Sequence, residues 1–253
     1  MMEYLLTFIV IYGAIAVRYL IVAVVFYIVY YKVFKSKFAG KKIQLKFPKN
    51  QDYIREIKYS LFAIFFFGIA GVISLRSPIS EYNQVNYDFK EMPIWYYIAC
   101  FPVMLVIHDT YFYWMHRSLH HPSLYKYTHE VHHRSTNPSP WAAYAFHPFE
   151  AILEAAILPI LAFTLPLHIS AIGLFFLFSI IYNVYGHSGY ELYPKSLNKH
   201  WAGKFLNTSI HHNMHHKEFK NSYGLYFTFW DRLMGTMAEQ YEEKFEEVTS
   251  RSY

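Results

Sequence analysis

Histidines are the residues with the clearest potential for chemistry in this chain of 253 residues. All 15 lie between His108 and His216, and most fall in short groups with regular spacing. The segments that carry the groups are HRSLHH, HEVHH and HNMHH. Residues three and four apart share one face of a helix. We therefore expect each H-x-x-H-H triplet to direct three imidazoles to one point, where a metal ion would bind.

Nine imidazoles form the expected ligand set, and nine are more than one ion accommodates, so the sequence predicts two metals. These ligands are His116, His120, His129, His132, His133, His187, His212, His215 and His216. Weaker candidates, either as ligands or as hydrogen-bond partners of ligands, are Asn183, His121, His147 and His211. The side chains of His108, His168 and His200 are expected to be packed or solvated instead.

The ligand types narrow the choice of metal without fixing it. Imidazole suits zinc, copper, iron and nickel. Cys100 is the one cysteine, so the chain cannot build a thiolate cluster or an internal disulfide, and structural zinc sites commonly need cysteine. A pair of irons with mostly neutral ligands would activate dioxygen and attack an unactivated C–H bond, which is chemistry that lipid chains require.

Two other functions fit parts of the same pattern. Residues 129–133, HEVHH, satisfy the H-E-x-x-H motif of zinc metallopeptidases, in which Glu130 would be the general base. That interpretation needs only one further ligand and so leaves six of the nine clustered histidines unexplained. A non-catalytic metal-binding membrane protein is the third possibility, and it would form no oxygen-dependent product.

Carboxylates are expected to support the ligands. A metal-bound histidine usually donates its other N–H group to a carboxylate or a carbonyl oxygen. The candidates near the histidine groups are Asp109, Glu130, Glu150, Glu191 and Asp231.

The elements that position these residues are predicted to be membrane helices. The chain is 54% hydrophobic and only 16% charged, which is unusual for a soluble domain. A bilayer core of about 30 Å needs roughly 20 apolar helical residues. The runs that qualify are 4–31, 57–75, 94–115, and a pair, 149–165 and 168–185, that turns at Pro166. We therefore expect an all-α, multi-span bundle of four or five apolar segments, with residues 1–253 forming a single membrane domain and a helical cap carrying the metal site. Whether the pair crosses fully is left open.

Charge predicts the orientation of this bundle. Seven lysines crowd the loop after the first run, between Lys32 and Lys49, whereas the loop at 76–92 carries more acidic than basic residues. The positive-inside rule then places the first loop and every histidine group in the cytoplasm, at a bacterial inner membrane or an endoplasmic reticulum. Since the lysines bunch beside apolar runs, the net charge of +5 indicates no nucleic acid partner. Arg18 lies in the middle of the first run and is expected to pack between helices or to reach toward the membrane surface.

From His108 to Thr236 the sequence resembles the fatty acid hydroxylase / sterol desaturase superfamily of membrane histidine-box di-iron oxygenases. The matching segments, in order, are YFYWMHRSLHH, LYKYTHEVHH, AFHPFEAILEA, HSGYEL, HHNMHHKEFKNSYG and FWDRLMGT. The resemblance implies that 108–236 is the catalytic region, that the nine histidines hold two irons, and that His187 is the ligand after the last span. Asn183 would match an asparagine that takes part through water in the similar acyl-CoA desaturases.

The resemblance also implies an activity and its partners. The expected reaction is hydroxylation or desaturation of a sterol, a fatty acyl chain or another long apolar lipid, with O2 as oxidant. The electrons would come from a separate reductase, a ferredoxin or a b-type cytochrome.

Overall fold

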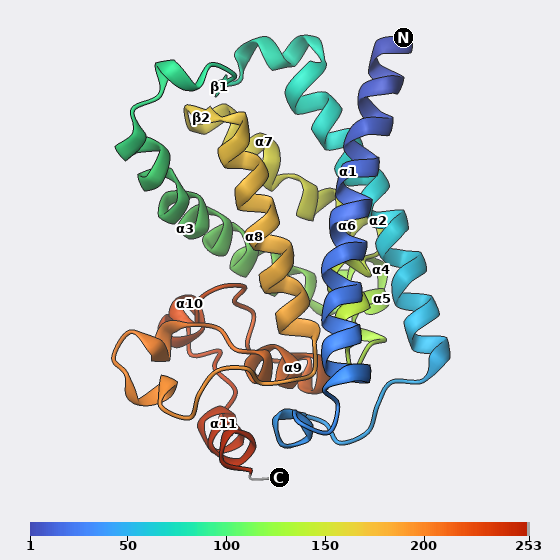
Figure 1. Cartoon of the computed structure of the whole chain (residues 1–253), viewed down its shortest axis with the longest axis vertical. Helices are drawn as coiled ribbons and strands as arrows, with labels where there is room; N and C mark the ends of the chain where they lie inside the picture. Colours follow the sequence, from blue (N-terminus) through green and yellow to red (C-terminus); the bar gives the residue numbers. More distant parts are fainter. Residues whose placement is uncertain (252–253) are drawn as a thin grey trace.

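A computed structural model describes residues 1–251, which fold mainly into helices (Figure 1). Within that range the strands are two short pieces, β1 (Val85–Asn86) and β2 (Leu167–His168), which pair in parallel. The prediction of an all-α architecture is therefore confirmed.

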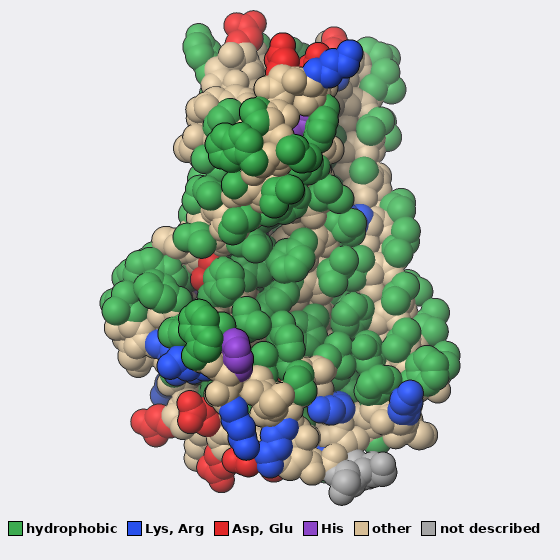
Figure 2. Space-filling model, turned by 60° about the vertical axis from the view of Figure 1, so that its left-hand side comes forward, with side chains coloured by type: hydrophobic (Ala, Val, Ile, Leu, Met, Phe, Trp, Pro, Cys, Tyr) green, Lys and Arg blue, Asp and Glu red, His purple; other side chains and the backbone are tan. Residues whose placement is uncertain are grey.

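Long apolar helices build the bundle. In residues 1–251, four are long and apolar enough to cross a membrane. They are α1 (Met2–Phe26, continued by a π-helix over Tyr27–Val33), α2 (Asn50–Arg76), α3 (Ile94–Leu119) and α8 (Ile169–His187). Figure 2 shows hydrophobic side chains covering the middle of the molecule, while most of the Lys and Arg side chains on this face gather at its lower end. The prediction of a multi-span membrane bundle is confirmed.

The run at 149–165 is not a continuous span, contrary to one of the two expected arrangements. It is divided into α6 (Pro148–Ala155) and α7 (Ile157–Thr164). Pro159 explains the break, because a proline lacks the N–H group and its ring clashes with the carbonyl four residues earlier, here that of Ala155. The bundle therefore has four long spans, and the fifth apolar segment is a pair of short helices.

The turn at Pro166 nevertheless reaches the far end of the bundle. β2 follows α7 directly and pairs with β1, which lies in the loop between α2 and α3. The N–H of Gln84 in that loop also donates to the carbonyl of Ala162 at 2.8 Å. In Figure 1 this turn and the N-terminus lie at the top, and α8 runs from there to the opposite end.

Short helices form the cap in the lower half of Figure 1. They are α4 (Pro122–Thr128), α5 (Glu130–His133), α9 (Ser209–Glu218), α10 (Phe229–Leu233) and α11 (Tyr241–Ser250), joined by 3-10 turns that include Pro140–Tyr144. We call this end of the molecule the histidine end, because it contains α5, α9 and the last turns of α3 and α8. The opposite end, with β1, β2 and the N-terminus, is the far end.

The lysine-rich first loop packs onto the histidine end. The N–H of Ile43 donates to the carbonyl of Gly189 at 3.0 Å, and the N–H of Glu191 donates to the carbonyl of Lys41 at 2.9 Å. These contacts attach the loop to the segment that immediately follows His187. The basic loop and the histidine groups therefore lie at the same end of the bundle, as the sequence predicts.

Candidate metal centre

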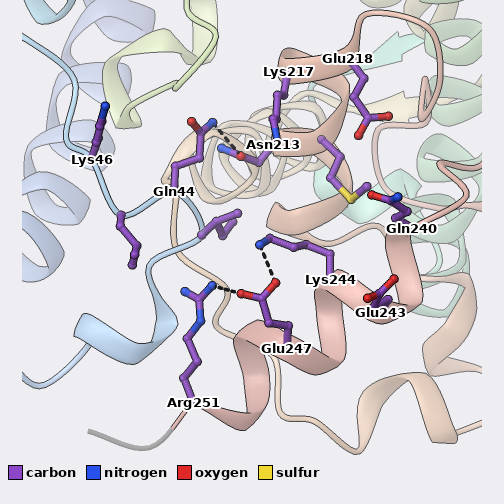
Figure 3. A pocket seen from close by; sticks show the side chains of 13 residues that line it. Gln44, Lys46, Asn213, Lys217, Glu218, Gln240, Glu243, Lys244, Glu247 and Arg251 are labelled. Carbon is purple, nitrogen blue, oxygen red and sulfur yellow. Dashed lines mark hydrogen bonds and ion pairs between the residues drawn. The ribbon is translucent and has the colours of Figure 1, made fainter.

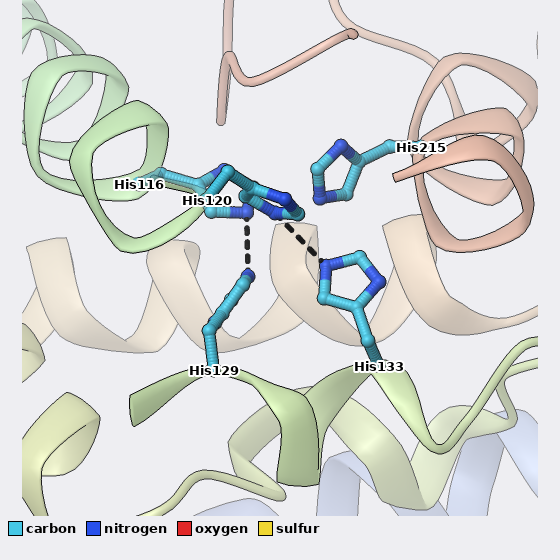
Figure 4. A group of neighbouring side chains, drawn as sticks. All are labelled: His116, His120, His129, His133 and His215. Carbon is cyan, nitrogen blue, oxygen red and sulfur yellow. Dashed lines mark hydrogen bonds between the residues drawn. The ribbon is translucent and has the colours of Figure 1, made fainter. Parts of the chain in front are cut away.

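The structure brings all nine expected ligand histidines together at the histidine end. They form two adjacent groups, and within each group the candidate ligand nitrogens all lie within 4.8 Å of one another. The first group, shown in Figure 4, is His116, His120, His129, His133 and His215, and the second is His132, His187, His212 and His216. The imidazole rings of His133 and His216, one from each group, have centroids 4.9 Å apart. The arrangement offers two neighbouring sites of nitrogen ligands.

Each H-x-x-H-H triplet is divided between the two groups, so the expectation that a triplet points to one place is wrong. His129 and His133 belong to the first group, whereas His132 belongs to the second. In α9 the division is reversed, because His212 and His216 share the second group and His215 joins the first. Neighbouring helical residues point about 100° apart, so the i+3 and i+4 side chains diverge. Each triplet thereby bridges both sites.

The ring nitrogens are spaced as ligands of a shared ion would be. The Nε2 atoms of His116 and His129 are 3.0 Å apart, and those of His187 and His212 are 2.9 Å apart. A neutral imidazole has one proton for two nitrogens, so such clusters cannot all be satisfied by hydrogen bonds among themselves. Two nitrogens each about 2.1 Å from one ion, at right angles, lie about 3 Å apart. The side chains present therefore fit a pair of metal ions.

Backbone carbonyl oxygens fix the orientation of three of these rings. The Nδ1–H groups of His116, His187 and His215 donate to carbonyl oxygens at 2.9, 2.8 and 2.6 Å. The acceptors belong to Tyr223, Asn183 and Asn221, respectively. A carbonyl can only accept, so Nδ1 carries the proton and Nε2 keeps its lone pair for a metal. The sequence contains no sign of these contacts, because any residue supplies a carbonyl.

Within the part of the chain that the structure describes, Glu150 is the one candidate carboxylate of the five that contacts any of the nine histidines. Its Oε1 accepts from His129 Nδ1 at 2.6 Å, and both side chains are buried. Glu150 lies in the first turn of α6, immediately beside the site. The carboxylate both orients the His129 ring and makes its Nε2 a stronger donor to a cation.

The other four carboxylates have different partners, which corrects the expectation that they contact the ligands. Oδ1 of Asp109 accepts backbone N–H groups of residues 225–227, and Glu191 accepts the hydroxyl of Tyr185 and the N–H of Ile210. Asp231 accepts the N–H groups of Tyr223 and Gly224, so it acts on the centre only through the segment that holds His116.

Glu130 lies at the surface, which argues against the peptidase interpretation. Its carboxylate is paired with Arg134 at 3.2 Å, and 39% of its side chain is exposed, whereas the neighbouring His129 is buried. A general base must reach the metal-bound water on the buried side.

Burial keeps the cap histidines neutral. It lowers the pKa of His129, His132, His133, His212, His215 and His216 well below the usual 6.5, and positive charge on neighbouring rings would lower each pKa further. At physiological pH these rings therefore have a free lone pair. Metal binding at such a site needs to displace few protons.

The weaker candidates lie outside both groups. His121, His147 and His168 cap the N-termini of α4, α6 and α8, each accepting a backbone N–H two residues later. His108 is buried and bonds to the hydroxyl of Tyr226, whereas His200 is exposed and accepts the N–H of Ala202, so one is packed and the other solvated, as expected.

Asn183 and His211 also have roles beside the centre. The side-chain amide of Asn183 donates to the carbonyl of Ala143, so its contact with the site is through the backbone carbonyl that holds His187. His211 is fully buried with a ring nitrogen 3.5 Å from Asp231.

A polar pocket of about 590 Å³ lies on the outer face of α9 (Figure 3). Asn213 and Met214, which lie between His212 and His215 in α9, form part of its wall. Lys46 and Lys217 line it as well. The pocket and the metal ligands are therefore on opposite faces of one helix.

The fold and the site define a multi-span membrane protein with two adjoining clusters of histidines, all buried except the half-buried His120. The sequence model of the family "Fatty acid hydroxylase" matches residues 101–236, a range that contains all nine histidines. This chain belongs to the fatty acid hydroxylase family.

Curated relatives are similar over most of the chain. A Delta(7)-sterol 5(6)-desaturase of Gibberella zeae is 33% identical over 202 residues, covering 76% of this chain and 57% of the relative. Human lathosterol oxidase is 34% identical over 194 residues, covering 76% of this chain and 62% of the relative, and rat lathosterol oxidase is 32% identical over 211 residues, covering 82% and 68%. The chain thus spans about six-tenths of the length of the first two. No solved structure matches the chain.

Proposed function

We propose that this protein is a membrane-bound non-haem di-iron oxygenase that hydroxylates or desaturates an apolar lipid. The observation that carries the proposal is the convergence of nine nitrogen-donor side chains, eight buried and His120 half-buried, into two adjoining groups at one end of a membrane bundle. Membership of the fatty acid hydroxylase family supports the same chemistry. Residues 108–236 are the proposed catalytic region.

The proposed metal is iron, held at both sites. The nine histidines would be its ligands, since they provide nitrogen donors and no thiolate, and since imidazole is a common iron ligand. Two irons bound there would supply the activation of O2 and the oxidation of an unactivated C–H bond.

The chain's own residues would prepare the site for that reaction. Glu150 and the carbonyls of Tyr223, Asn183 and Asn221 hold the rings in the orientation that ligation needs. Burial of the histidines keeps bulk water away from the metals, so a reactive oxidant would attack the lipid rather than water.

A sterol is the favoured substrate class within the proposal, with fatty acyl chains and other long lipids as the wider set. The support comes from the relatives, which are named as a Delta(7)-sterol 5(6)-desaturase and as lathosterol oxidases. The apolar surface of the bundle leads from the membrane to the histidine end, so a lipid need not cross water to reach the site (Figure 2).

Lipid profiling tests this function. Membranes that contain the wild-type chain should accumulate a lipid that is heavier than its precursor by one oxygen atom or lighter by two hydrogen atoms, and only when O2 is present. A His132→Ala chain at the same expression level should form none, because His132 Nε2 lies in the second group. A profile that is identical with and without the chain would contradict the proposal and favour a metal-binding protein without catalysis.

We further propose that the histidine end faces the cytoplasm and receives electrons there from an acidic one-electron carrier, such as a ferredoxin or a b-type cytochrome. The support is the charge of this end, where the first loop carries Lys35, Lys37, Lys41, Lys42, Lys46 and Lys49, whereas the far-end loop carries Glu81, Asp88 and Glu91. The pocket behind α9 is the proposed contact, because it adjoins the helix with three ligand histidines and its lining is slightly more basic than acidic (Figure 3). The charged residues that line it are Lys46, Lys217, Lys244 and Arg251 against Glu218, Glu243 and Glu247.

Charge reversal at this pocket tests the docking. The Lys46→Glu/Lys217→Glu double variant should slow iron reduction by reduced ferredoxin by roughly 10-fold at low salt, because it removes electrostatic steering. Reduction by dithionite should be unchanged. Lys90→Glu at the far end is the matched control, and a vesicle with only its far end exposed should accept no electrons from added ferredoxin. Equal effects of the two charge reversals would contradict the proposed surface.

A further inference from the structure

The outer face of α10 is apolar although it belongs to the cap. Phe229 and Leu233 are four residues apart, so they project from the same side of the helix, and they are 50% and 63% exposed. Met234 follows them and is also exposed. Contiguous exposed apolar side chains on a cap surrounded by water would be unfavourable, which indicates a partner for this face.

This face continues the apolar surface of a membrane-spanning helix. Trp230 of α10 packs edge-on against Trp114 of α3, with ring centroids 5.5 Å apart, and its indole N–H donates to Thr110 Oγ1 at 3.1 Å. Trp114 is itself exposed, as are Val103 and Val106 higher on α3. A lipid that contacts α3 can therefore contact α10 without a break in the apolar surface.

The position and charges of α10 are those of a membrane interface. In Figure 1, α10 lies level with the lower turns of α8, not beyond the end of the bundle. Two arginines flank the face: the guanidinium of Arg117 lies 5.9 Å from the Trp114 ring, and that of Arg232 donates to the carbonyl of Lys204 at 3.0 Å. Tryptophan and arginine beside apolar residues are typical of the zone where lipid tails meet headgroups.

We propose that α10 and its neighbour on α3 form a membrane-contacting lip that is inserted among the lipids of the leaflet at the histidine end. The lip consists of Trp114, Phe229, Trp230, Leu233 and Met234. Its partner is the lipid surface itself, with the apolar side chains among acyl chains and the two arginines at headgroup level. The cap is thus partly embedded in the membrane.

The lip is connected to the metal centre by two successive hydrogen bonds. Asp231, on the inner side of α10, accepts the N–H of Tyr223 at 2.9 Å, and the carbonyl of Tyr223 accepts from His116 Nδ1 at 2.9 Å. The helix that contacts lipid with its outer side therefore helps to orient the ring of His116 on its inner side.

Spin labels at two leucines of similar exposure test the lip. Leu233→Cys and Leu45→Cys would be labelled with a nitroxide in a Cys100→Ala chain, where Leu45 is 68% exposed and lines the polar pocket behind α9. Unsubstituted chain, whose Cys100 is buried, checks for background labelling. In phosphatidylcholine/phosphatidylglycerol vesicles, relaxation by oxygen relative to an aqueous nickel chelate should be several-fold higher at 233 than at 45.

Either of two results would overturn this assignment. If the label at 233 is as accessible to the nickel chelate as the label at 45, the lip lies in water. If the label at 233 is shielded from both oxygen and nickel, protein covers it, either a second copy of this chain or another partner.

Discussion

Replacing His187 by alanine is expected to abolish product formation while the bundle still folds. Its Nε2 lies 2.9 Å from that of His212, 3.2 Å from that of His216 and 3.3 Å from that of His132, so it contacts every other member of the second group. Its loss leaves three imidazoles around a gap. Turnover should fall by more than the roughly 10- to 100-fold that loss of an outer hydrogen-bond partner costs. Product formed per chain in isolated membranes measures the effect.

His168→Ala is the matched control, because His168 lies at the other end of the same helix. Its side chain caps α8 by accepting the N–H of Ser170. Loss of a cap costs about 1 kcal/mol of stability, so most of the activity should remain. If the two alanine variants lose activity equally, the assignment of His187 as a ligand is wrong.

Removal of the Glu150 carboxylate is expected to have the second largest effect. Without it, Nδ1 of His129 loses its acceptor inside a buried site, and ring orientation is no longer fixed. Glu150→Ala should lower activity, or the affinity for iron, by roughly 10- to 100-fold. Glu150→Gln should lower it less, since an amide oxygen can still accept from His129. Iron titration followed by turnover at saturating iron separates the two effects.

Glu130→Gln provides the control and also tests the peptidase interpretation. Glu130 adjoins His129 in the sequence, yet it forms a surface ion pair with Arg134, of a kind worth about 0–1 kcal/mol. Activity should therefore stay near that of the wild-type chain. An inactive Glu130→Gln variant beside an active Glu150→Ala variant would be the pattern of an H-E-x-x-H hydrolase and would contradict the oxygenase.

Much of the site could be predicted from the sequence because histidines are rare and their spacing is informative. All nine predicted ligands fall into the two groups, and the positions of the four long spans follow from apolar length alone. The division of each triplet does not follow from a rule that places residues three and four apart on one helical face. His129 and His133 are one turn apart, but the 100° step from His132 to His133 sends them to different sites.

The supporting contacts could not be predicted as well. Five carboxylates were candidates, and only the fold shows that Glu150 at the start of α6 reaches His129. The carbonyl of Tyr223 accepts from His116 because the backbone passes close to that ring. Every residue has a carbonyl, so the residue type does not reveal which one lies at the site. The capping histidines did have a signal: His121 and His147 each precede a proline, which favours the first position of a helix. Pro159 likewise marked the break between α6 and α7.

Metal content is the most direct measure of the central claim, that nine imidazoles from α3, α5, α8 and α9 and their flanking residues hold two ions. Purified full-length chain, loaded anaerobically with ferrous iron and passed through a chelating column, should retain about two irons per chain by elemental analysis. Its Mössbauer spectrum should show iron with nitrogen and oxygen ligands at two sites. Retention of a single zinc per chain, with no iron bound, would contradict the account.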